Sequence, residues 1–242
     1  MVSKNQIKLI TSLQQKKYRI INQLFFAEGV KVIQELLQSN FELEHLYTTV
    51  NDFEAVEASK RTLINEQELK KISALSTPNT CLAVFKIPAE NKIIDSGLIL
   101  ALDDIRDPGN LGTILRLADW FGIKQIVCSK ETVDIYNPKV VQATMGSITR
   151  VNVSYIELPN FLNETKLPVF GTFMDGDNIY QSNLPQNGII IMGNEANGIS
   201  AKIEKLVTSR LTIPRFGELQ KTESLNVATA TAIILSEFKR NS

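Results

Sequence analysis

The chain has 242 residues, in which 26 lysines and arginines balance 26 aspartates and glutamates. With 43% hydrophobic residues, 12 glycines and 8 prolines, the composition is typical of a water-soluble globular protein and excludes a collagen-like or mainly disordered chain. This length exceeds the common size of one domain, so we expect two domains, or one large α/β unit with an appendage.

The first 88 residues alternate predicted helices and strands. Apolar residues spaced three and four apart predict a helix over residues 4–13, and the basic segment 14–19 follows it. Further patterns predict strands at 24–27, 43–50 and 81–85, and helices at 28–37, 51–59 and 66–73. The sequence therefore predicts a small α/β domain over residues 1–88, followed by a linker at 89–96 with little apolar patterning.

After the linker the alternation restarts on a larger scale over residues 97–242. Predicted strands lie at 98–102, 125–128, 150–153, 169–172, 189–192 and 211–213, and predicted helices at 110–121, 138–144, 200–206 and 225–239. This pattern predicts an α/β fold with a mainly parallel sheet and helices on both faces. Ligands in such sheets bind outside the carboxyl ends of the strands, so we expect the site in the loops there.

Simple features exclude several locations and partners. No uninterrupted apolar stretch approaches the roughly 20 residues that cross a bilayer, and the N-terminus lacks the apolar region of a signal peptide. Cys81 and Cys128 stand alone, which argues for reduced thiols in the cytoplasm and against structural zinc. The net charge of zero gives no global attraction to nucleic acid, but residues 1–27 contain five cations and no acid.

The first chemical motif is segment 102–116, which begins at the end of a buried strand. Asn110 is predicted to cap the following helix, and Arg116 falls nearly opposite the stripe that packs on the sheet. Arg116 could be an ordinary solvated arginine, but Trp120 lies one turn later on the same side, which favours a ligand or a second subunit there. The nearby acids Asp103, Asp104 and Asp107 suit turn and cap roles better than Mg²⁺ binding, since no phosphate-binding loop accompanies them.

Two further motifs follow later strands. Gly193-Asn194-Glu195 with Gly198 occupies the position of a nucleotide-binding loop, but it lacks both GxGxxG and GxxxxGK[ST] spacing, and its acid would repel phosphate. Segment 213–230 contains Ser224, which is predicted to cap the last helix. An ordinary turn and an ordinary capped helix would each explain these segments taken alone.

Together and in this order, the three segments resemble the motifs of the SpoU (TrmH-type) RNA 2′-O-ribose methyltransferases of the knotted SPOUT superfamily. Asn110 and Arg116 match the first motif, residues 193–195 with Gly198 match the second, and Ile213-Pro214 with residues 224–227 match the third. The resemblance spans residues 97–240, and residues 16–29 with the following helix resemble the family's N-terminal substrate-binding domain.

The resemblance implies a fold, a cofactor and a reaction. It implies a deep trefoil knot in the C-terminal segments, a topology that general folding rules would exclude. It also implies S-adenosylmethionine bound by Met192, Gly193, Ile213 and Leu225, largely through backbone groups, so a side chain at position 193 is expected to block the cofactor. The implied reaction is methylation of a ribose 2′-hydroxyl in ribosomal or transfer RNA.

The resemblance also implies the catalytic residues: Arg116, Asn110, Glu195, Ser224 and Asn226. A guanidinium is almost never deprotonated, so we expect Arg116 to orient a phosphate and stabilise developing negative charge rather than act as a base. The other four are expected to position the ribose and Arg116. The only histidine, His45, lies in the N-terminal domain, where we expect a structural role, and no metal is expected.

The expected partners are RNA and a second copy of the chain. Lys16, Lys17 and Arg19 are expected to contact RNA phosphates, although a solvated basic face is an open alternative. Leu117 and Trp120, with small residues of the last helix, are expected to form a homodimer interface.

Two other functions and two departures from the family stay open. The main alternative is a catalytically inactive RNA-binding protein of the same fold, and a nicotinamide-dependent dehydrogenase is disfavoured because GxGxxG is missing. The segment 218–223 looks like an insertion in the third motif, and Ala-Thr-Ala at 228–230 replaces the family's frequent Ser-Val-Ala.

Overall fold

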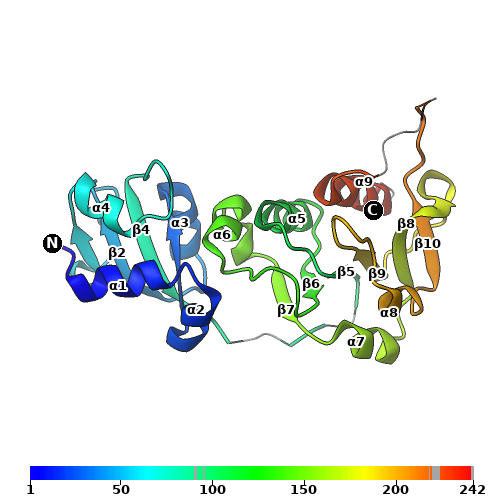
Figure 1. The fold of residues 1–242 in the computed structure, drawn as a ribbon, viewed down its shortest axis with the longest axis horizontal. Helices are drawn as coiled ribbons and strands as arrows, with labels where there is room; N and C mark the ends of the chain where they lie inside the picture. Colours follow the sequence, from blue (N-terminus) through cyan, green and yellow to red (C-terminus); the bar gives the residue numbers. More distant parts are fainter. Residues whose placement is uncertain (90–91, 95, 218, 220–223, 241–242) are drawn as a thin grey trace. The chain divides into compact units, whose positions relative to one another are not determined.

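The structure is a computed structural model that describes residues 1–89, 92–94, 96–217, 219 and 224–240 (Figure 1). The chain forms two compact units, one of residues 1–89 with 134–149 and the other of residues 90–133 with 150–242. Residues 90, 91 and 95 of the predicted linker lie outside the described residues. Within the described ranges, no helix is long and apolar enough to cross a membrane.

The first unit contains one four-stranded sheet in the order β1-β4-β2-β3, in which only β2 and β3 are parallel. Its elements are α1 (Lys4–Ser12), α2 (Lys16–Asn22), β1 (Leu24–Glu28), α3 (Val30–Leu37), β2 (Leu43–Thr48), η1 (Ala58–Lys60), β3 (Arg61–Leu63), α4 (Glu66–Ile72), β4 (Cys81–Lys86), α6 (Pro138–Thr144) and η2 (Ser147–Thr149).

Neighbouring phenylalanines of β1 bury against opposite faces of this sheet, as strand alternation requires. Phe26 joins a core that includes Ile10 of α1 and Leu69 of α4. Phe25 lies on the other side, where its ring centroid is 4.8 Å from that of Tyr136. Residues 134–149 thus complete the core of the first unit, although they lie far along the sequence.

One local prediction for this unit is wrong, and one strand was not predicted. Residues 51–57 form turns, with the 3₁₀ helix η1 after them, instead of the predicted helix at 51–59. Phe53 is well buried there while most of its neighbours are exposed, so no continuous apolar face supports a helix. The short strand β3 was not predicted, because its three residues carry no clear alternation.

Arg19 is the only buried residue of α2, and its side chain is 2% exposed. Its guanidinium donates to Asp134 Oδ2 from Nε at 2.8 Å and from Nη2 at 2.5 Å, and Nη1 donates to the carbonyls of Leu13 and Gln14. The prediction that Arg19 contacts RNA phosphate is therefore wrong in this structure, because its donors are committed inside the protein. Lys16 and Lys17 are exposed.

The second unit contains a six-stranded, fully parallel sheet in the order β10-β8-β9-β5-β6-β7, which confirms the predicted fold class. Its elements are β5 (Leu98–Leu102), α5 (Pro108–Trp120), β6 (Gln125–Cys128), β7 (Asn152–Tyr155), α7 (Leu158–Glu164), β8 (Val169–Asn178), η3 (Ile179–Gln181), β9 (Gly188–Met192), α8 (Ala201–Glu204), β10 (Ser209–Thr212) and α9 (Val227–Lys239). The implied trefoil knot stays a prediction.

Helices cover both faces of this sheet, with α5 and α9 on one side and α7 and α8 on the other (Figure 1). Ile99 and Ile191 pack in one core with Leu162 of α7 and Ile203 of α8. On the other side, α9 packs against α5 within the same chain. One face of α9 is therefore used within the chain, and the expected role of its small residues in a homodimer interface stays a prediction.

The length of β8 and the helix α7 were not predicted. β8 continues from the predicted 169–172 to Asn178, where it pairs with β10. Its second half is polar and contains Gly176, where a Cβ would lie 2.6 Å from the backbone carbon of Leu211. Because of Gly176 and the acids around it, this half of β8 shows no strand pattern in the sequence. The close backbone contact nevertheless requires glycine there.

We predict that Arg19→Ala lowers the free energy of unfolding by about 3–5 kcal/mol, because it leaves Asp134 and two carbonyls without their buried donor. The control is Lys17→Ala, two residues earlier on an exposed site, which should change stability by less than about 0.5 kcal/mol. Urea denaturation followed by circular dichroism measures both. Equal losses in the two variants would show that the buried guanidinium has no special role.

Candidate functional site

The three sequence motifs meet at the carboxyl ends of β5 and β9. Leu102 and Met192, the last residues of these strands, pair directly in the sheet. The chain leaves β5 toward β6 on one side, whereas β9 lies on the other, so this is the point at which the strand order reverses. Such a point is the usual ligand site of an open parallel sheet.

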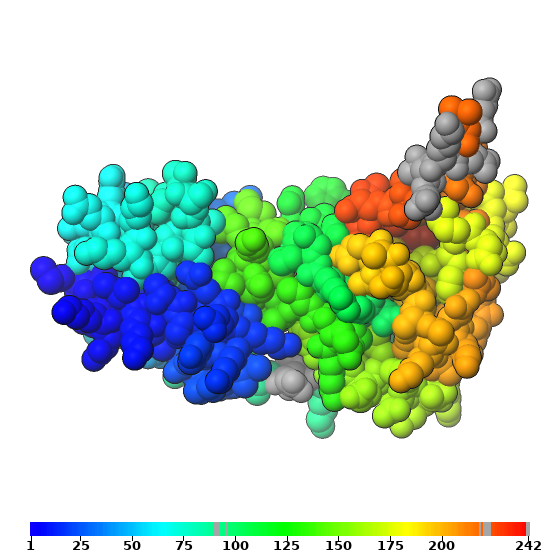
Figure 2. Space-filling view, viewed as in Figure 1, coloured from blue at the N-terminus to red at the C-terminus, as the bar shows by residue number. Residues whose placement is uncertain are grey.

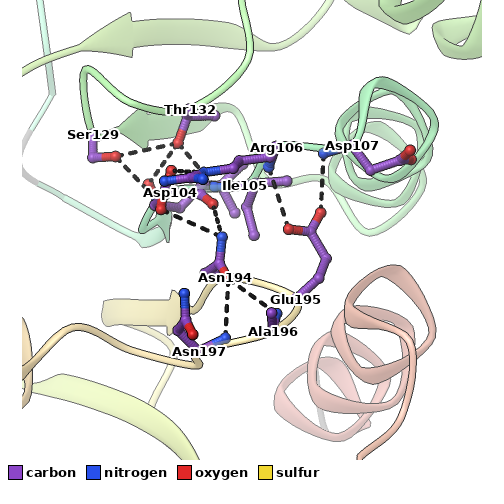
Figure 3. A network of polar contacts seen from close by, with 11 residues as sticks. Asp104, Ile105, Arg106, Asp107, Ser129, Thr132, Asn194, Glu195, Ala196 and Asn197 are labelled. Atoms are coloured by element: carbon purple, nitrogen blue, oxygen red, sulfur yellow. Dashed lines mark hydrogen bonds and ion pairs between the residues drawn. The ribbon is translucent and has the colours of Figure 1, made fainter.

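A chain of hydrogen bonds joins one residue from each motif. Asn110 Nδ2 donates to Glu195 Oε1 at 3.0 Å, and Asn226 Nδ2 donates to Asn110 Oδ1 at 2.9 Å. Glu195 also accepts from the backbone amides of Arg106, at 3.3 Å, and Asp107, at 3.2 Å (Figure 3). We call Glu195, Asn110 and Asn226 the carboxylate–amide chain.

The helix caps differ from those predicted. As a result, the Asn110 side chain is available for the carboxylate–amide chain. Asp107 caps α5 by accepting from the amide of Asn110 at 2.8 Å, with Pro108 at the first helical position. Asn226, rather than Ser224, caps α9 through Oδ1, which accepts from the amides of Ala228 and Thr229. The predictions that Asn110 and Ser224 are caps are wrong. Asn110 can therefore direct its whole side chain to other motifs.

Asn194 shapes the loop after β9. It is 8% exposed, its Oδ1 accepts from the amides of Ala196 and Asn197, and its Nδ2 donates to the carbonyl of Asp104 at 2.7 Å (Figure 3). Its backbone also pairs with that of Gly198, whose φ of +68° only glycine adopts without strain. Sequence reasoning gave Asn194 no role of its own, although it lies inside the second motif.

Glycine is required at position 193 because other backbone atoms of the protein lie close to it. A Cβ at this position would lie 2.3 Å from the backbone carbon of Gly198 and from the backbone nitrogen of Ile199. The expectation that a side chain here would act by blocking the cofactor is therefore wrong in mechanism, since the substitution first breaks the loop. Replacement of Gly193 cannot serve as a test of cofactor contact.

The acids of the first motif have turn roles, as predicted. Asp103 Oδ2 accepts from the amide of Ser200 at 2.7 Å, and Asp104, at φ +58°, accepts from Arg106 Nε at 2.9 Å. Asp107 caps α5. Among the described residues, no group of three or more histidine, cysteine, aspartate or glutamate side chains could hold a metal ion.

Two cavities adjoin the carboxylate–amide chain. The smaller, of about 680 Å³, is lined by Asn110, Glu195, Ser224 and Asn226, among other residues. The larger, of about 1160 Å³, is lined by Met192, Gly193, Ile213 and Leu225, with other residues of β8, β10 and α9. Glu195 and Leu225 line both cavities. The structure thus brings together four predicted catalytic residues in one cavity and all four predicted cofactor residues in its neighbour.

The larger cavity also contains residues that no motif indicated. Phe173 of β8 lies in its wall, and the Arg210 guanidinium carbon is 3.6 Å from the ring centroid. Arg210 is held there by ion pairs with Asp175 and Glu204. Phe173 and Arg210 belong to strands that were predicted only in part, so their side chains could not be assigned to the site from the sequence.

Arg116 lies apart from the other predicted catalytic residues. It is exposed on α5 and lines neither cavity. Trp120, one turn later, is 84% exposed, whereas Leu117 is half-buried. One exposed face of α5 therefore carries both the cation and a large aromatic side chain.

Glu195 is held in its ionised form by its neighbours. Partial burial raises the pKa of this carboxyl, but the hydrogen bonds from Asn110 and from backbone amides, among them those of Arg106 and Asp107, outweigh burial and lower the pKa below its ordinary value of 4.5. A negative charge is therefore fixed where both cavities meet.

We predict that Glu195→Gln destabilises the protein at pH 7 and does so less as the pH falls. A carboxyl with a lowered pKa contributes stability that is present above about pH 4.5 and is lost as the pH falls through the folded-state value. Unfolding free energies of the wild type and the variant, measured from pH 7 to pH 3.5, check this. A difference that stays constant over that range would mean that the ionised form is not what the hydrogen bonds stabilise.

Family models and known proteins resemble nearly the whole chain. The model of the SpoU rRNA methylase family matches residues 97–236, and that of the MRM3-like substrate-binding domain matches residues 4–83. The 23S rRNA (guanosine(2553)-2′-O)-methyltransferase RlmP of Bacillus subtilis is 31% identical over 98% of this chain and 97% of its own length.

Solved structures agree in fold over the same extent. A protein of Porphyromonas gingivalis assigned to the TrmH family of RNA methyltransferases has a TM-score of 0.91 and 40% identity, with all of both chains covered. An AdoMet-bound rRNA methyltransferase of Sinorhizobium meliloti has a TM-score of 0.87 and 28% identity over 99% of this chain and 97% of its own. With its three motifs joined at one site, the chain belongs to the SpoU rRNA methylase family.

Proposed function

We propose that this chain methylates a ribose 2′-hydroxyl in ribosomal RNA, with S-adenosylmethionine as the methyl donor. The observation that carries the proposal is the carboxylate–amide chain, which joins Glu195, Asn110 and Asn226 beside a large cavity. The relative from Bacillus subtilis is named for this reaction on 23S rRNA, and the Sinorhizobium protein is an rRNA methyltransferase with AdoMet bound.

The larger cavity fits the cofactor in chemistry. Its apolar walls, which include Phe173, Ile213 and Leu225, suit an adenine ring, and Glu195 at its edge suits a ligand that carries a positive charge. No phosphate-binding glycine spacing lies nearby, which suits a ligand without phosphates. Bound S-adenosylmethionine supplies the methyl group. Met192, Gly193, Ile213 and Leu225 would hold it.

The residues of the smaller cavity would position the ribose. Asn110 and Asn226 present amide groups whose orientation Glu195 fixes, and Ser224 adds an exposed hydroxyl. Fixed amides can hold the ribose so that its 2′-hydroxyl faces the methyl donor. Arg116 would bind an RNA phosphate and stabilise the negative charge that develops as the hydroxyl loses its proton.

His45 lies outside this chemistry. Its Nε2 is 2.8 Å from Thr62 Oγ1 in the first unit, and burial lowers the pKa of its ring despite the nearby Glu44. These contacts agree with the expected structural role.

We propose a homodimer that brings Arg116 to the site. Within one chain Arg116 lines neither cavity, and it shares an exposed face with Trp120. A twofold contact through this face would bury the indole and place Arg116 near a subunit boundary. Assembly and activity would then depend on the same helix.

The proposed location is the cytoplasm, where ribosomal RNA would be met. Cys81 and Cys128 are free and buried, and burial raises the pKa of both thiols, to about 11 for Cys81. Such thiols are unreactive core residues and fit a reducing compartment.

The predicted insertion at 218–223 lies outside the described residues except for Leu219.

We predict that the protein binds S-adenosylmethionine and S-adenosylhomocysteine, but not NAD, because Glu195 offers an acid where a pyrophosphate needs donors.

Arg116→Ala should abolish methyl transfer and leave cofactor affinity within about twofold, and Arg116→Lys should not restore activity, because lysine lacks the planar fork. Calorimetry and transfer of labelled methyl groups to unmodified 23S rRNA measure these properties. Full activity of Arg116→Ala, or NAD binding without S-adenosylhomocysteine binding, would refute the assignment.

We predict that Lys16→Ala with Lys17→Ala weakens RNA binding and lowers its salt slope by about 1.5 units, as the loss of two phosphate contacts requires. The charge-matched control replaces Lys70 and Lys71, exposed in the last turn of α4. Binding is measured between 50 and 200 mM salt. The same slope in the wild type and the Lys16, Lys17 variant would mean that this face is only solvated.

We predict that Trp120→Glu gives a folded monomer without methyltransferase activity, since a buried charge would separate the two copies. Light scattering, circular dichroism and the methyl-transfer assay test the three properties together. A wild type that is monomeric at micromolar concentration, or a monomeric variant with full activity, would rule out the dimer.

A further inference from the structure

The helix α2 has an inverted distribution of side chains. Its single buried residue is Arg19, whereas Ile20 is 56% exposed, Ile21 is 62% exposed and Tyr18 is 37% exposed. An ordinary surface helix buries its apolar residues and exposes its cations. In α2 the four hydrogen bonds of the Arg19 guanidinium anchor the helix, so that its apolar residues remain in solvent.

The exposed apolar residues of α2 lie among cations. Lys16 and Lys17 precede Tyr18 directly, and the Lys17 ammonium lies 5.9 Å from the centroid of the Tyr18 ring. We call Lys16, Lys17, Tyr18, Ile20 and Ile21 the α2 patch. The helix lies at the surface of the first unit, among the dark blue atoms of Figure 2.

An occupant of the α2 patch must combine negative charge with flat apolar surface. Residues 1–27 contain no acid, so the local charge of this stretch favours an anionic ligand. A duplex presents phosphates but keeps its bases stacked inside, whereas unpaired nucleotides present both phosphates and base faces. Aromatic side chains beside cations are the usual platform for unpaired bases, and exposed isoleucines extend such an apolar surface.

We propose that the α2 patch binds unpaired nucleotides of the RNA substrate, with Tyr18, Ile20 and Ile21 against base faces and the lysines on the adjoining phosphates. The proposal rests on the proposed function only in naming the substrate as RNA. It assigns the first unit a preference for an RNA loop or bulge over a continuous helix.

The test separates apolar from ionic binding by using a labelled 20-nucleotide oligouridine and a 20-base-pair RNA duplex as probes. The double variant Ile20→Ser with Ile21→Ser should bind oligouridine at least about fivefold more weakly, as the loss of base contacts requires, with an unchanged salt slope. Tyr18→Leu should show a similar loss and Tyr18→Phe none. Duplex affinity should stay the same in all three variants.

The control is Leu63→Ser, which removes an apolar side chain that is 61% exposed from elsewhere in the same unit. Circular dichroism checks that the variants are folded. Oligouridine affinities within twofold of the wild type for the isoleucine variant would overturn the proposal, as would equal losses on the duplex. A change in oligomeric state caused by Ile20→Ser with Ile21→Ser would overturn it too, since a second copy would then cover the patch.

A separate assay keeps this proposal distinct from the proposed function. Methyl transfer by the wild type to unmodified 23S rRNA tests the function alone. A wild type that binds oligouridine through the α2 patch but transfers no methyl group would refute the function and leave the patch supported. An active wild type with unaltered binding in the patch variants would do the reverse.

Discussion

The arrangement of the site depends on one carboxylate. Glu195 accepts hydrogen bonds from the Asn110 amide and from two backbone amides of the loop after β5, and Asn110 passes the connection to Asn226 at the start of α9. Three chain segments that are far apart in sequence therefore share one set of charge-assisted and amide hydrogen bonds. The Glu195 contact adds to the bonds of Asn194 and Asp103, which also join the loops after β5 and β9.

Two residues joined by this contact also cap helices. Asp107 and Asn226 satisfy the first amides of α5 and α9, and Asn226 does so with Oδ1 while its Nδ2 still reaches Asn110. An aspartate at position 226 would cap the helix equally well but could not donate. The residue types at the site therefore follow from the donors and acceptors that each must offer at the same time.

In the first unit, a buried cation has the corresponding role. The Arg19 guanidinium donates hydrogen bonds to Asp134 and to two backbone carbonyls. These bonds hold α2 in place without an apolar face. The segment that supplies Asp134 lies within the region that matches the methylase model, yet it packs in the first unit. The boundary between the two units therefore differs from the boundary between the two family models.

The sequence predicted the repeating parts of the fold, because buried strands such as 98–102 and 189–192 carry their signal in consecutive residues. It also predicted the residues that gather at the site, with the exception of Arg116, since the motif order indicated a family. It assigned the cap of α5 to Asn110, since Asp107 and Asn110 are both good capping residues, although Pro108 at the first helical position favours Asp107. Arg19 was misassigned for a similar reason, since its partner Asp134 is 115 residues away.

The most direct test of the account is a double-mutant cycle across the carboxylate–amide chain. Glu195→Gln weakens one end, and Asn226→Asp keeps the cap of α9 but removes the donor at the other end. Methyl transfer to unmodified 23S rRNA gives kcat/KM for the wild type, both single variants and the double variant. If the carboxylate–amide chain acts as one unit, kcat/KM of the double variant is only slightly lower than that of the less active single variant. Losses that add in full on a logarithmic scale would show that Glu195 and Asn226 act independently.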